Sequence, residues 1–130
     1  MAKESFELKA VFNVTPPDLY KAWLDGELHS KMTGGLAECS NEPGGMFTAW
    51  DGYISGENKD LIEGSKIVQS WRTTEFEEED EDSLLTLQFR EIENGMTELT
   101  LHHSNIPEGQ TQYEDGWRDH YFQPMSEFFK

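Results

Sequence analysis

Apolar and polar residues alternate over much of the chain, beginning with the segment from Ser5 to Val14. A period of two places every second side chain on one face, which predicts a half-buried strand there. The same alternation, bounded by turn residues, predicts six further strands. Their expected ranges are 36–40, 46–50, 53–62, 66–74, 84–92 and 96–104. The sequence Glu93-Asn94-Gly95 between the last two is the strongest hairpin signal in the chain.

Two short helices are expected between the first and second strands. Thr15 fits a helix N-cap, and Pro16 fits the first helical position. This first helix should end near Asp25-Gly26. A second one is predicted over Glu27–Met32, where Gly34-Gly35 stops it.

A longer helix is predicted near the end of the chain, from about Gln112 to Phe129. Trp117 and Tyr121 lie on one apolar stripe, and a second apolar stripe runs beside it. Pro124 lacks a backbone donor and should kink the helix one turn earlier, near His120. Because the apolar surface is unusually wide, the helix should be held on more than one side.

This order of elements predicts an α+β domain of the helix-grip type. A curved antiparallel sheet of about seven strands should wrap around the long C-terminal helix, with two short helices following the first strand. The pattern contains neither a repeat nor a linker, so residues 1–130 are predicted to form a single domain. A strongly curved sheet cannot pack flush along one helix, which predicts an apolar cavity between them.

Strand parity and the helical stripe point a set of mostly aromatic and aliphatic side chains toward this space. The candidate ligand-binding residues are Phe47, Trp71, Leu87, Phe89, Leu101, His103, Trp117 and Tyr121. Residues of this kind also fill packed cores, so the sequence leaves a pocket and a solid core as alternatives.

Charge and composition narrow the class of partner. The chain has 26 acidic residues against 10 lysines and arginines, a net charge of −16. Such a surface repels nucleic acid and anionic lipid, so neither is an expected partner. No apolar run approaches the roughly 20 residues of a membrane helix. Cys39 is the only cysteine, and no apolar leader precedes the first strand, which together favour a cytoplasmic protein.

Motifs of catalysis are missing from the sequence. His102 and His103 are adjacent on a strand and therefore point to opposite faces, so they cannot bind one metal together. His103 on the inner face could orient a ligand, act as a general base, or be a hydrogen-bonded structural residue. No phosphate loop, dinucleotide fingerprint or metal motif occurs, so no cofactor is expected. The acidic segment Glu75–Asp82 is either a docking surface for a basic partner or a solvated loop.

Several short motifs carry a family resemblance that runs from about Phe6 to Phe129. They are Gly44-Gly45-Met46-Phe47, Trp50-Asp51-Gly52, Ser55-Gly56-Glu57, Lys66-Ile67-Val68-Gln69-Ser70-Trp71-Arg72, Thr97-Glu98-Leu99-Thr100-Leu101, Ile106-Pro107-Glu108-Gly109, Gly116-Trp117 and Tyr121-Phe122-Gln123-Pro124. As a set they resemble the C-terminal-type domain of the family called activator of the heat-shock protein 90 ATPase homologue. That family belongs to the START-related, or SRPBCC, superfamily with the helix-grip, or Bet v 1-like, fold.

The resemblance implies a non-enzymatic, co-chaperone-like binding protein with a chaperone of the heat-shock protein 90 class as its partner. In the eukaryotic co-chaperone, the similar domain touches the chaperone's N-terminal region while the ATPase closes, and a separate N-terminal domain gives most of the stimulation. Two alternatives stay open. The first is a carrier of a small hydrophobic ligand, lipid or polyketide-like, in the cavity. The second is a cavity enzyme of the cyclase or dehydratase type.

Overall fold

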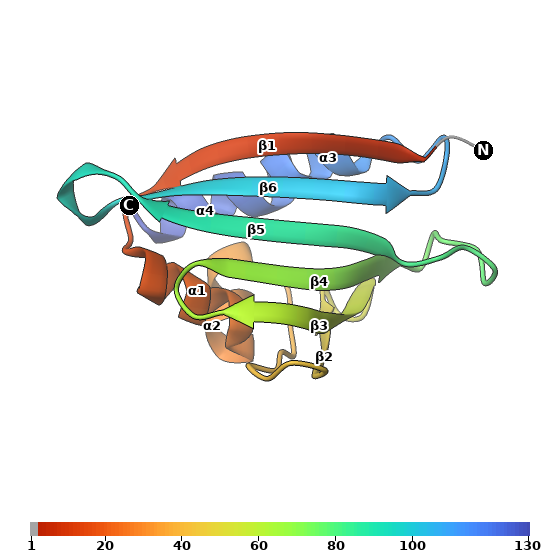
Figure 1. Ribbon diagram of the computed structural model, residues 1–130, viewed down its shortest axis with the longest axis horizontal. Helices are drawn as coiled ribbons and strands as arrows, with labels where there is room; N and C mark the ends of the chain where they lie inside the picture. The colour runs from red at the N-terminus through yellow and green to blue at the C-terminus, as the bar shows by residue number, and fades with distance from the viewer. Residues whose placement is uncertain (1–2) are drawn as a thin grey trace.

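The computed structural model describes residues 3–130. One curved antiparallel sheet organises this part of the chain, with strand order β1-β6-β5-β4-β3-β2 (Figure 1). Its strands are β1 (Glu4–Phe12), β2 (Met46–Ala49), β3 (Ile54–Ile62), β4 (Lys66–Thr73), β5 (Ser83–Glu91) and β6 (Thr97–Ile106). Strands β2 to β6 form a meander of sequential neighbours, and β1 adds to the free edge of β6.

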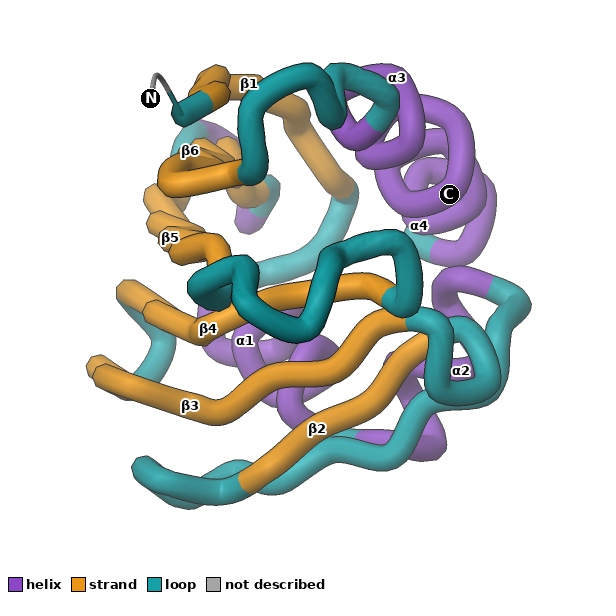
Figure 2. The backbone as a smooth tube through the Cα atoms, turned by 90° about the vertical axis from the view of Figure 1, so that its right-hand side faces the viewer, coloured by secondary structure: helices purple, strands orange, loops and turns teal. Residues whose placement is uncertain are grey.

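The helices gather on one side of the sheet, as Figure 2 shows in a view along the strands. They comprise α1 (Pro16–Leu24) and α2 (Gly26–Thr33), then a C-terminal helical segment made of α3 (Tyr113–Gly116), the π-helix η2 (Trp117–Phe122) and α4 (Gln123–Phe128). A single 3-10 turn, η1 (Glu93–Gly95), joins β5 to β6 where the hairpin was expected. The α+β helix-grip class predicted from the sequence is thus confirmed.

Local signals explain where α1 and α2 begin and end. The Thr15 side chain accepts a hydrogen bond from the Asp18 backbone N–H (3.4 Å), the predicted N-cap. The Asp25 carboxylate caps α2 by accepting from the Leu28 N–H at 3.0 Å. Gly34 ends α2 in the left-handed conformation, with φ of 88°, which glycine adopts without a steric penalty.

The strand count is six rather than about seven. The expected strand at 36–40 makes only one bridge, Glu38 to Thr48 of β2. Other structure bounds this segment at both ends. Gly34 ends helix α2 before it, and after it the Ser40 hydroxyl accepts a hydrogen bond from the Glu42 N–H in the next turn. Too few residues remain between these two points to form a ladder, so the segment only crosses the edge of the sheet.

Near His120, where the sequence predicts a kink, the structure has the π-helix η2. Pro124 stands in the first turn of α4, where a missing N–H costs least. The helix widens just upstream instead, and the N–H of Gln123 bonds to the carbonyl of Arg118, five residues back. Because π-turns absorb an interruption without breaking the helix, the apolar stripes stay continuous.

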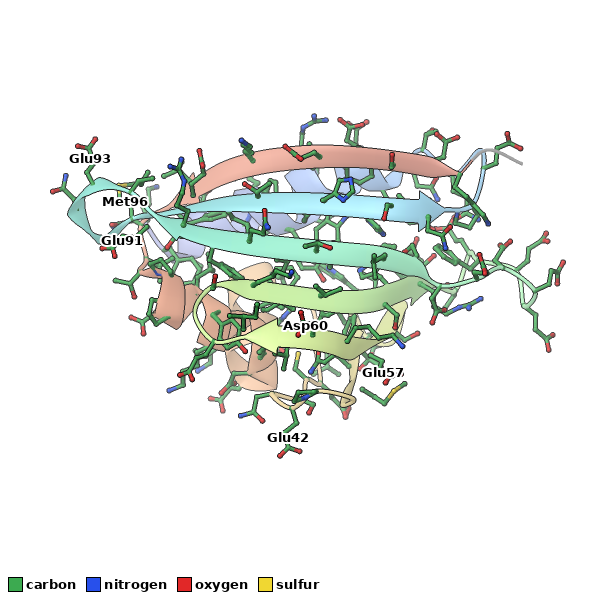
Figure 3. All side chains as sticks on the ribbon, viewed as in Figure 1. Glu42, Glu57, Asp60, Glu91, Glu93 and Met96 are labelled. Carbon is green, nitrogen blue, oxygen red and sulfur yellow. The ribbon has the colours of Figure 1, made fainter. Side chains whose placement is uncertain are left out.

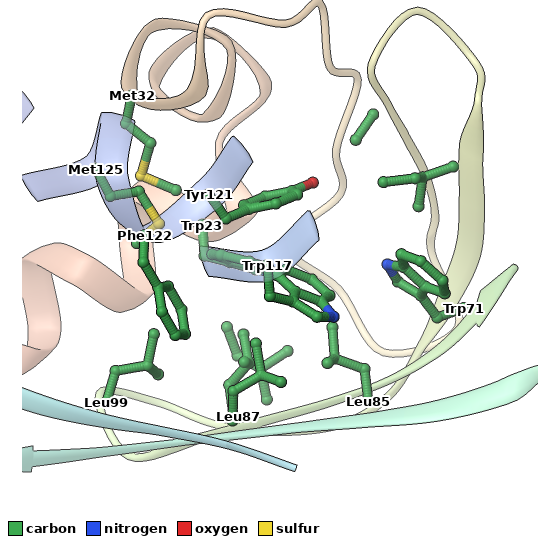
Figure 4. Close-up of a cluster of buried hydrophobic side chains, with 14 of the residues drawn as sticks. Trp23, Met32, Trp71, Leu85, Leu87, Leu99, Trp117, Tyr121, Phe122 and Met125 are labelled. Carbon is green, nitrogen blue, oxygen red and sulfur yellow. The ribbon is translucent and has the colours of Figure 1, made fainter. Parts of the chain in front are cut away.

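The core lies between the concave face of the sheet and the helices. Cross-strand pairs such as Leu87 with Leu101 put aliphatic side chains opposite one another on the inner face. Figure 4 shows inner-face leucines pointing toward the C-terminal helical segment. The buried aromatic and sulfur side chains that meet them are Trp23, Met32, Trp117, Tyr121, Phe122 and Met125.

Acidic side chains extend outward from the outer face of the sheet and from the turns, as Figure 3 shows with Glu57 and Glu93 among its labels. The alternation along the strands therefore separates a dry inner face from a charged outer one. This arrangement explains how a chain of net charge −16 still forms a compact apolar core.

The close approach of β3 to β4 gives a test of this packing. A Cβ on Gly56 would lie 1.9 Å from the Ser70 carbonyl oxygen and 2.6 Å from a Phe47 ring carbon. Gly56→Ala should therefore destabilise the fold by about 3 kcal/mol, a typical cost of overpacking. Urea unfolding of the variant and the parent measures this difference.

Gly116→Ala is the matched control for Gly56→Ala. Gly116 has ordinary helical angles, with φ of −58°, and a Cβ there would meet nothing within 4 Å. Since alanine is the better helix former, this variant should unfold at the same urea concentration or a higher one. Equal destabilisation by both substitutions would contradict the packing seen around Gly56.

Candidate functional site

The C-terminal helix and the sheet form the walls of a cavity of about 340 Å³, open to solvent on one side, at the end of the molecule where β2 turns into β3. Figure 4 shows Trp71 of β4 opposite Trp117 and Tyr121 of the helix. The full lining comprises Trp50, Tyr53, Ile54, Trp71, Tyr113, Gly116, Trp117, His120 and Tyr121. The volume lies near the lower end of the range of small-molecule sites.

Helical periodicity places three of these rings side by side. Tyr113, Trp117 and Tyr121 are spaced by four residues and form one stripe that faces the sheet. The ring centroids of Trp117 and Tyr121 are 4.4 Å apart, and Trp71 of β4 lies 5.7 Å from Trp117 and 5.1 Å from Tyr113. The cavity walls are therefore a continuous aromatic surface.

The turn between β2 and β3 forms the mouth of the cavity. Trp50 and Asp51 both have left-handed backbones, with φ of 52° and 58°, a conformation that is uncommon for residues with a side chain. This turn holds the half-buried Trp50 ring 6.2 Å from the ring of Tyr121 and 6.0 Å from that of His120. Tyr53 follows at the start of β3.

Few polar groups border the cavity. The Tyr113 hydroxyl donates to Gln110 Oε1 (2.7 Å) and accepts from the Thr73 hydroxyl (2.7 Å). The Tyr53 hydroxyl donates to the Glu75 carboxylate. Burial raises the pKa of both phenols, and for Tyr53 the bond to Glu75 adds to the effect. Both hydroxyls therefore stay neutral, and the Glu75 carboxylate brings negative charge to the edge of the cavity.

His103 lies behind the cavity wall rather than in it. The Trp117 indole N–H donates to His103 Nδ1 at 3.0 Å, so Nδ1 carries no proton. In the neutral ring Nε2 holds the proton and donates to the Ser83 hydroxyl at 2.8 Å. The Ser83 hydroxyl in turn donates to the Trp71 carbonyl (2.5 Å). With both ring nitrogens occupied, this geometry favours the structural role among the three roles left open by the sequence.

The structure brings only part of the predicted site together. Trp71, Trp117 and Tyr121 line the cavity. The other candidates are buried but do not line the cavity, and His103 among them lies behind its wall: Phe47, Leu87, Phe89, Leu101 and His103. Trp23 of α1 accounts for much of this difference, because it stacks on Trp117 with centroids 6.1 Å apart and fills the middle of the concave face. Ligand binding by any of these residues stays a prediction.

Several lining residues were not among the sequence candidates. Tyr113 could have been found by extending the spacing of Trp117 and Tyr121 back by one more turn. Trp50 and Tyr53 flank the Asp51-Gly52 turn, and only the hairpin geometry shows that the turn folds over the end of the helix. No periodicity in the sequence carries that information.

The Arg72 side chain anchors the acidic segment Glu75–Asp82. The Arg72 guanidinium donates to the Asp82 carboxylate (2.7 Å) and to the backbone carbonyl of Glu77 (2.8 Å). It also lies over the Phe76 ring, 5.4 Å from its centroid, a favourable cation–π distance. Phe76 is buried against Trp71, so the loop is fastened beside the cavity.

Within residues 3–130 no cluster of three histidine, cysteine or carboxylate side chains could hold a metal ion. None of the helices in this part of the chain has the length and apolarity needed to cross a bilayer. Burial raises the pKa of the Cys39 thiol to about 11, which keeps it protonated and unreactive at neutral pH.

The buried imidazoles predict an acid-sensitive fold. Burial lowers the pKa of His103 to about 3, against about 6.5 in an unfolded chain. Below about pH 6.5 the His103 imidazole binds a proton in the unfolded chain but stays neutral in the folded protein. The contribution of His103 to the unfolding free energy is therefore fully present above this pH and declines as the pH falls toward 3. His103 alone should cost about 2 kcal/mol of unfolding free energy between pH 7 and pH 5.

Urea unfolding at pH 7 and pH 5 of the parent and two variants tests this effect. In His103→Gln the drop in unfolding free energy between pH 7 and pH 5 should be smaller by about 2 kcal/mol. The reason is that the glutamine amide can replace both hydrogen bonds of the imidazole without binding a proton. His102→Gln, on the outer face of the same strand, should leave most of the loss in place, because burial is the larger cause of the lowered His103 pKa and the neighbouring His102 the smaller one. A similar pH dependence in the parent and in His103→Gln would mean that His103 is not the sensor.

Known proteins resemble this chain in sequence over most of its length. A family model described as Activator of Hsp90 ATPase homolog 1-like protein matches residues 13–130. The human Activator of 90 kDa heat shock protein ATPase homolog 1 is 32% identical over 123 residues, which are 94% of this chain and 36% of that protein. A Dictyostelium discoideum homologue is 31% identical over 88% of this chain and 30% of its own length. The chain therefore spans about a third of the curated relatives that it matches.

Solved structures share the fold over nearly the whole chain. The crystal structure of an HSP90 activator from Plasmodium falciparum aligns with a TM-score of 0.81 and 29% identity, covering 92% of this chain and 90% of that one. The Aha1 dimer from Colwellia psychrerythraea aligns with a TM-score of 0.80 at 14% identity, which is a likeness of fold. With the family model covering the chain from Asn13 to its last residue, this chain belongs to the family of Activator of Hsp90 ATPase homolog 1-like proteins.

Proposed function

We propose that this domain is a non-enzymatic binding protein that contacts a chaperone of the heat-shock protein 90 class and favours its closed, ATP-hydrolysing state. The observation that carries the proposal is the family match over residues 13–130. Two relatives are named as activators of that ATPase, and their similarity extends over most of this chain. A cytoplasmic location, predicted from the lone cysteine, is consistent with such a partner.

The charge of the domain supports a basic docking region on the partner. The net charge is −16, and carboxylates project from the outer face of the sheet and from its turns (Figure 3). Complementary charge mainly accelerates association and makes it sensitive to salt. The charge attraction itself is weakened by salt, because ions screen exposed charges. We therefore expect binding with a marked salt dependence.

Titration into a purified chaperone from the same source tests the proposal. ATP turnover should rise with added domain, and more steeply at 50 mM than at 200 mM salt, because screening weakens the charge attraction. An inhibitor of the chaperone's nucleotide site supplies the background rate. An unrelated acidic protein of similar net charge is the control and should give no stimulation. An unchanged rate, together with no complex in sedimentation, would contradict the proposal.

A second candidate function is to carry a small hydrophobic molecule in the cavity. The supporting observation is a mostly aromatic space of about 340 Å³ with few polar groups, the general arrangement of ligand sites. A cavity enzyme has weaker support, since the candidate base His103 uses both ring nitrogens internally.

The four tryptophans report on cavity binding without any label. A ligand in the cavity should shift the indole N–H signals of Trp50, Trp71 and Trp117 in NMR spectra. Trp23 is the internal reference, because it lies outside the lining and its N–H bonds to Gln69 at 3.2 Å. Shifts confined to Trp23, or none across a broad library of apolar compounds, would argue against a carrier.

A further inference from the structure

We propose that the cavity takes small organic cations of the quaternary ammonium type. The inference rests on the second candidate function, because it names the ligand class for the same cavity. It starts from the composition of the lining, which is far more aromatic than a site for an aliphatic chain requires.

Six of the nine lining residues are tryptophan or tyrosine. The face of an aromatic ring attracts a cation placed within about 6 Å of its centroid, and tryptophan does so best. The rings of Trp71 and Tyr113 meet at 82°, and those of Trp71 and Trp117 at 38°. Because the planes of neighbouring rings are inclined to one another, the rings do not form a flat stack. They surround a common space with both faces and edges.

The electrostatics of the site favour positive charge. The lining contains no lysine or arginine, and its one histidine, His120, is exposed to solvent. The phenols of Tyr53 and Tyr113 are held neutral by burial. The Glu75 carboxylate binds the Tyr53 hydroxyl at the mouth, and the net charge of −16 makes the surrounding potential negative. An anion would be repelled here, and a neutral ligand would gain nothing from the carboxylate.

The size of the cavity sets a limit on the ligand. A volume of about 340 Å³ has room for a choline-sized cation but not for a long lipid, since sites for drug-sized molecules extend to about 1,000 Å³. His120 is exposed and Trp50 and Tyr53 are half-buried, whereas Trp71 and Trp117 are buried, which puts the entrance between the β2–β3 turn and His120 of the helix.

Choline and its neutral isostere 3,3-dimethylbutan-1-ol form the decisive pair of probes, because they share shape and hydroxyl and differ in charge. Binding is followed by tryptophan fluorescence and by the indole N–H shifts of Trp50 and Trp71. We expect choline to bind at least about tenfold more tightly than the alcohol, a ratio within the usual strength of cation–π contacts. Equal affinities would overturn the cation inference and leave the carrier function standing. Failure of both probes and of the wider apolar library would remove both.

Three variants assign the binding to this cavity. Glu75→Gln keeps an acceptor for the Tyr53 hydroxyl and should weaken choline several-fold without changing the alcohol. Glu78→Gln removes the same charge from an exposed position of the same loop and is the matched control. Gly116→Leu grows a side chain into open space of the lining and should abolish binding while unfolding normally. Choline binding that survives Gly116→Leu would place the site elsewhere and overturn the proposal.

Discussion

The contact of Trp117 with its neighbours holds the domain together. Its ring lies against Trp23 of α1, Trp71 of β4 and Tyr121 one turn along its own helix. Its indole N–H bonds to His103 of β6. One side chain thus joins the C-terminal helical segment, α1 and two strands of the sheet. Large buried aromatic rings dominate the energetics of protein cores. The sheet curves around this point, and the cavity is the space left beside it.

A series of hydrogen bonds behind Trp117 adds specific, directional contacts to an otherwise apolar core. His103, Ser83 and the Trp71 carbonyl form a hydrogen-bonded series across β6, β5 and β4. Apolar contacts tolerate small shifts, but a buried donor without its acceptor costs about 1–3 kcal/mol. This hydrogen-bonded series therefore favours one register of the strands and one depth of the helix. Its members are fully occupied with one another, which explains why a histidine on the inner face takes no visible part in the cavity.

The two proposed functions would use different parts of the structure. The family match extends over residues 13–130, whereas the cavity occupies one end of the structure, between the β2–β3 turn and the helix. A partner that binds the charged outer surface need not compete with a ligand inside. The loop fastened by Arg72 lies between these regions, since Phe76 packs on Trp71 in the cavity wall while the carboxylates face water.

The sequence by itself determined the elements and their order, because these depend on short-range patterns. Alternation set the strands, Thr15 and Gly34 set helix ends, and Glu93-Asn94-Gly95 set the last hairpin. Tertiary structure decided the rest. Whether residues 36–40 paired as a strand depended on the space left at the sheet edge. Trp23, distant in sequence, fills the middle of the concave face, so only Trp71, Trp117 and Tyr121 of the predicted set line the cavity. Parity and periodicity tell which way a side chain points, but what it meets there is a matter of non-local packing.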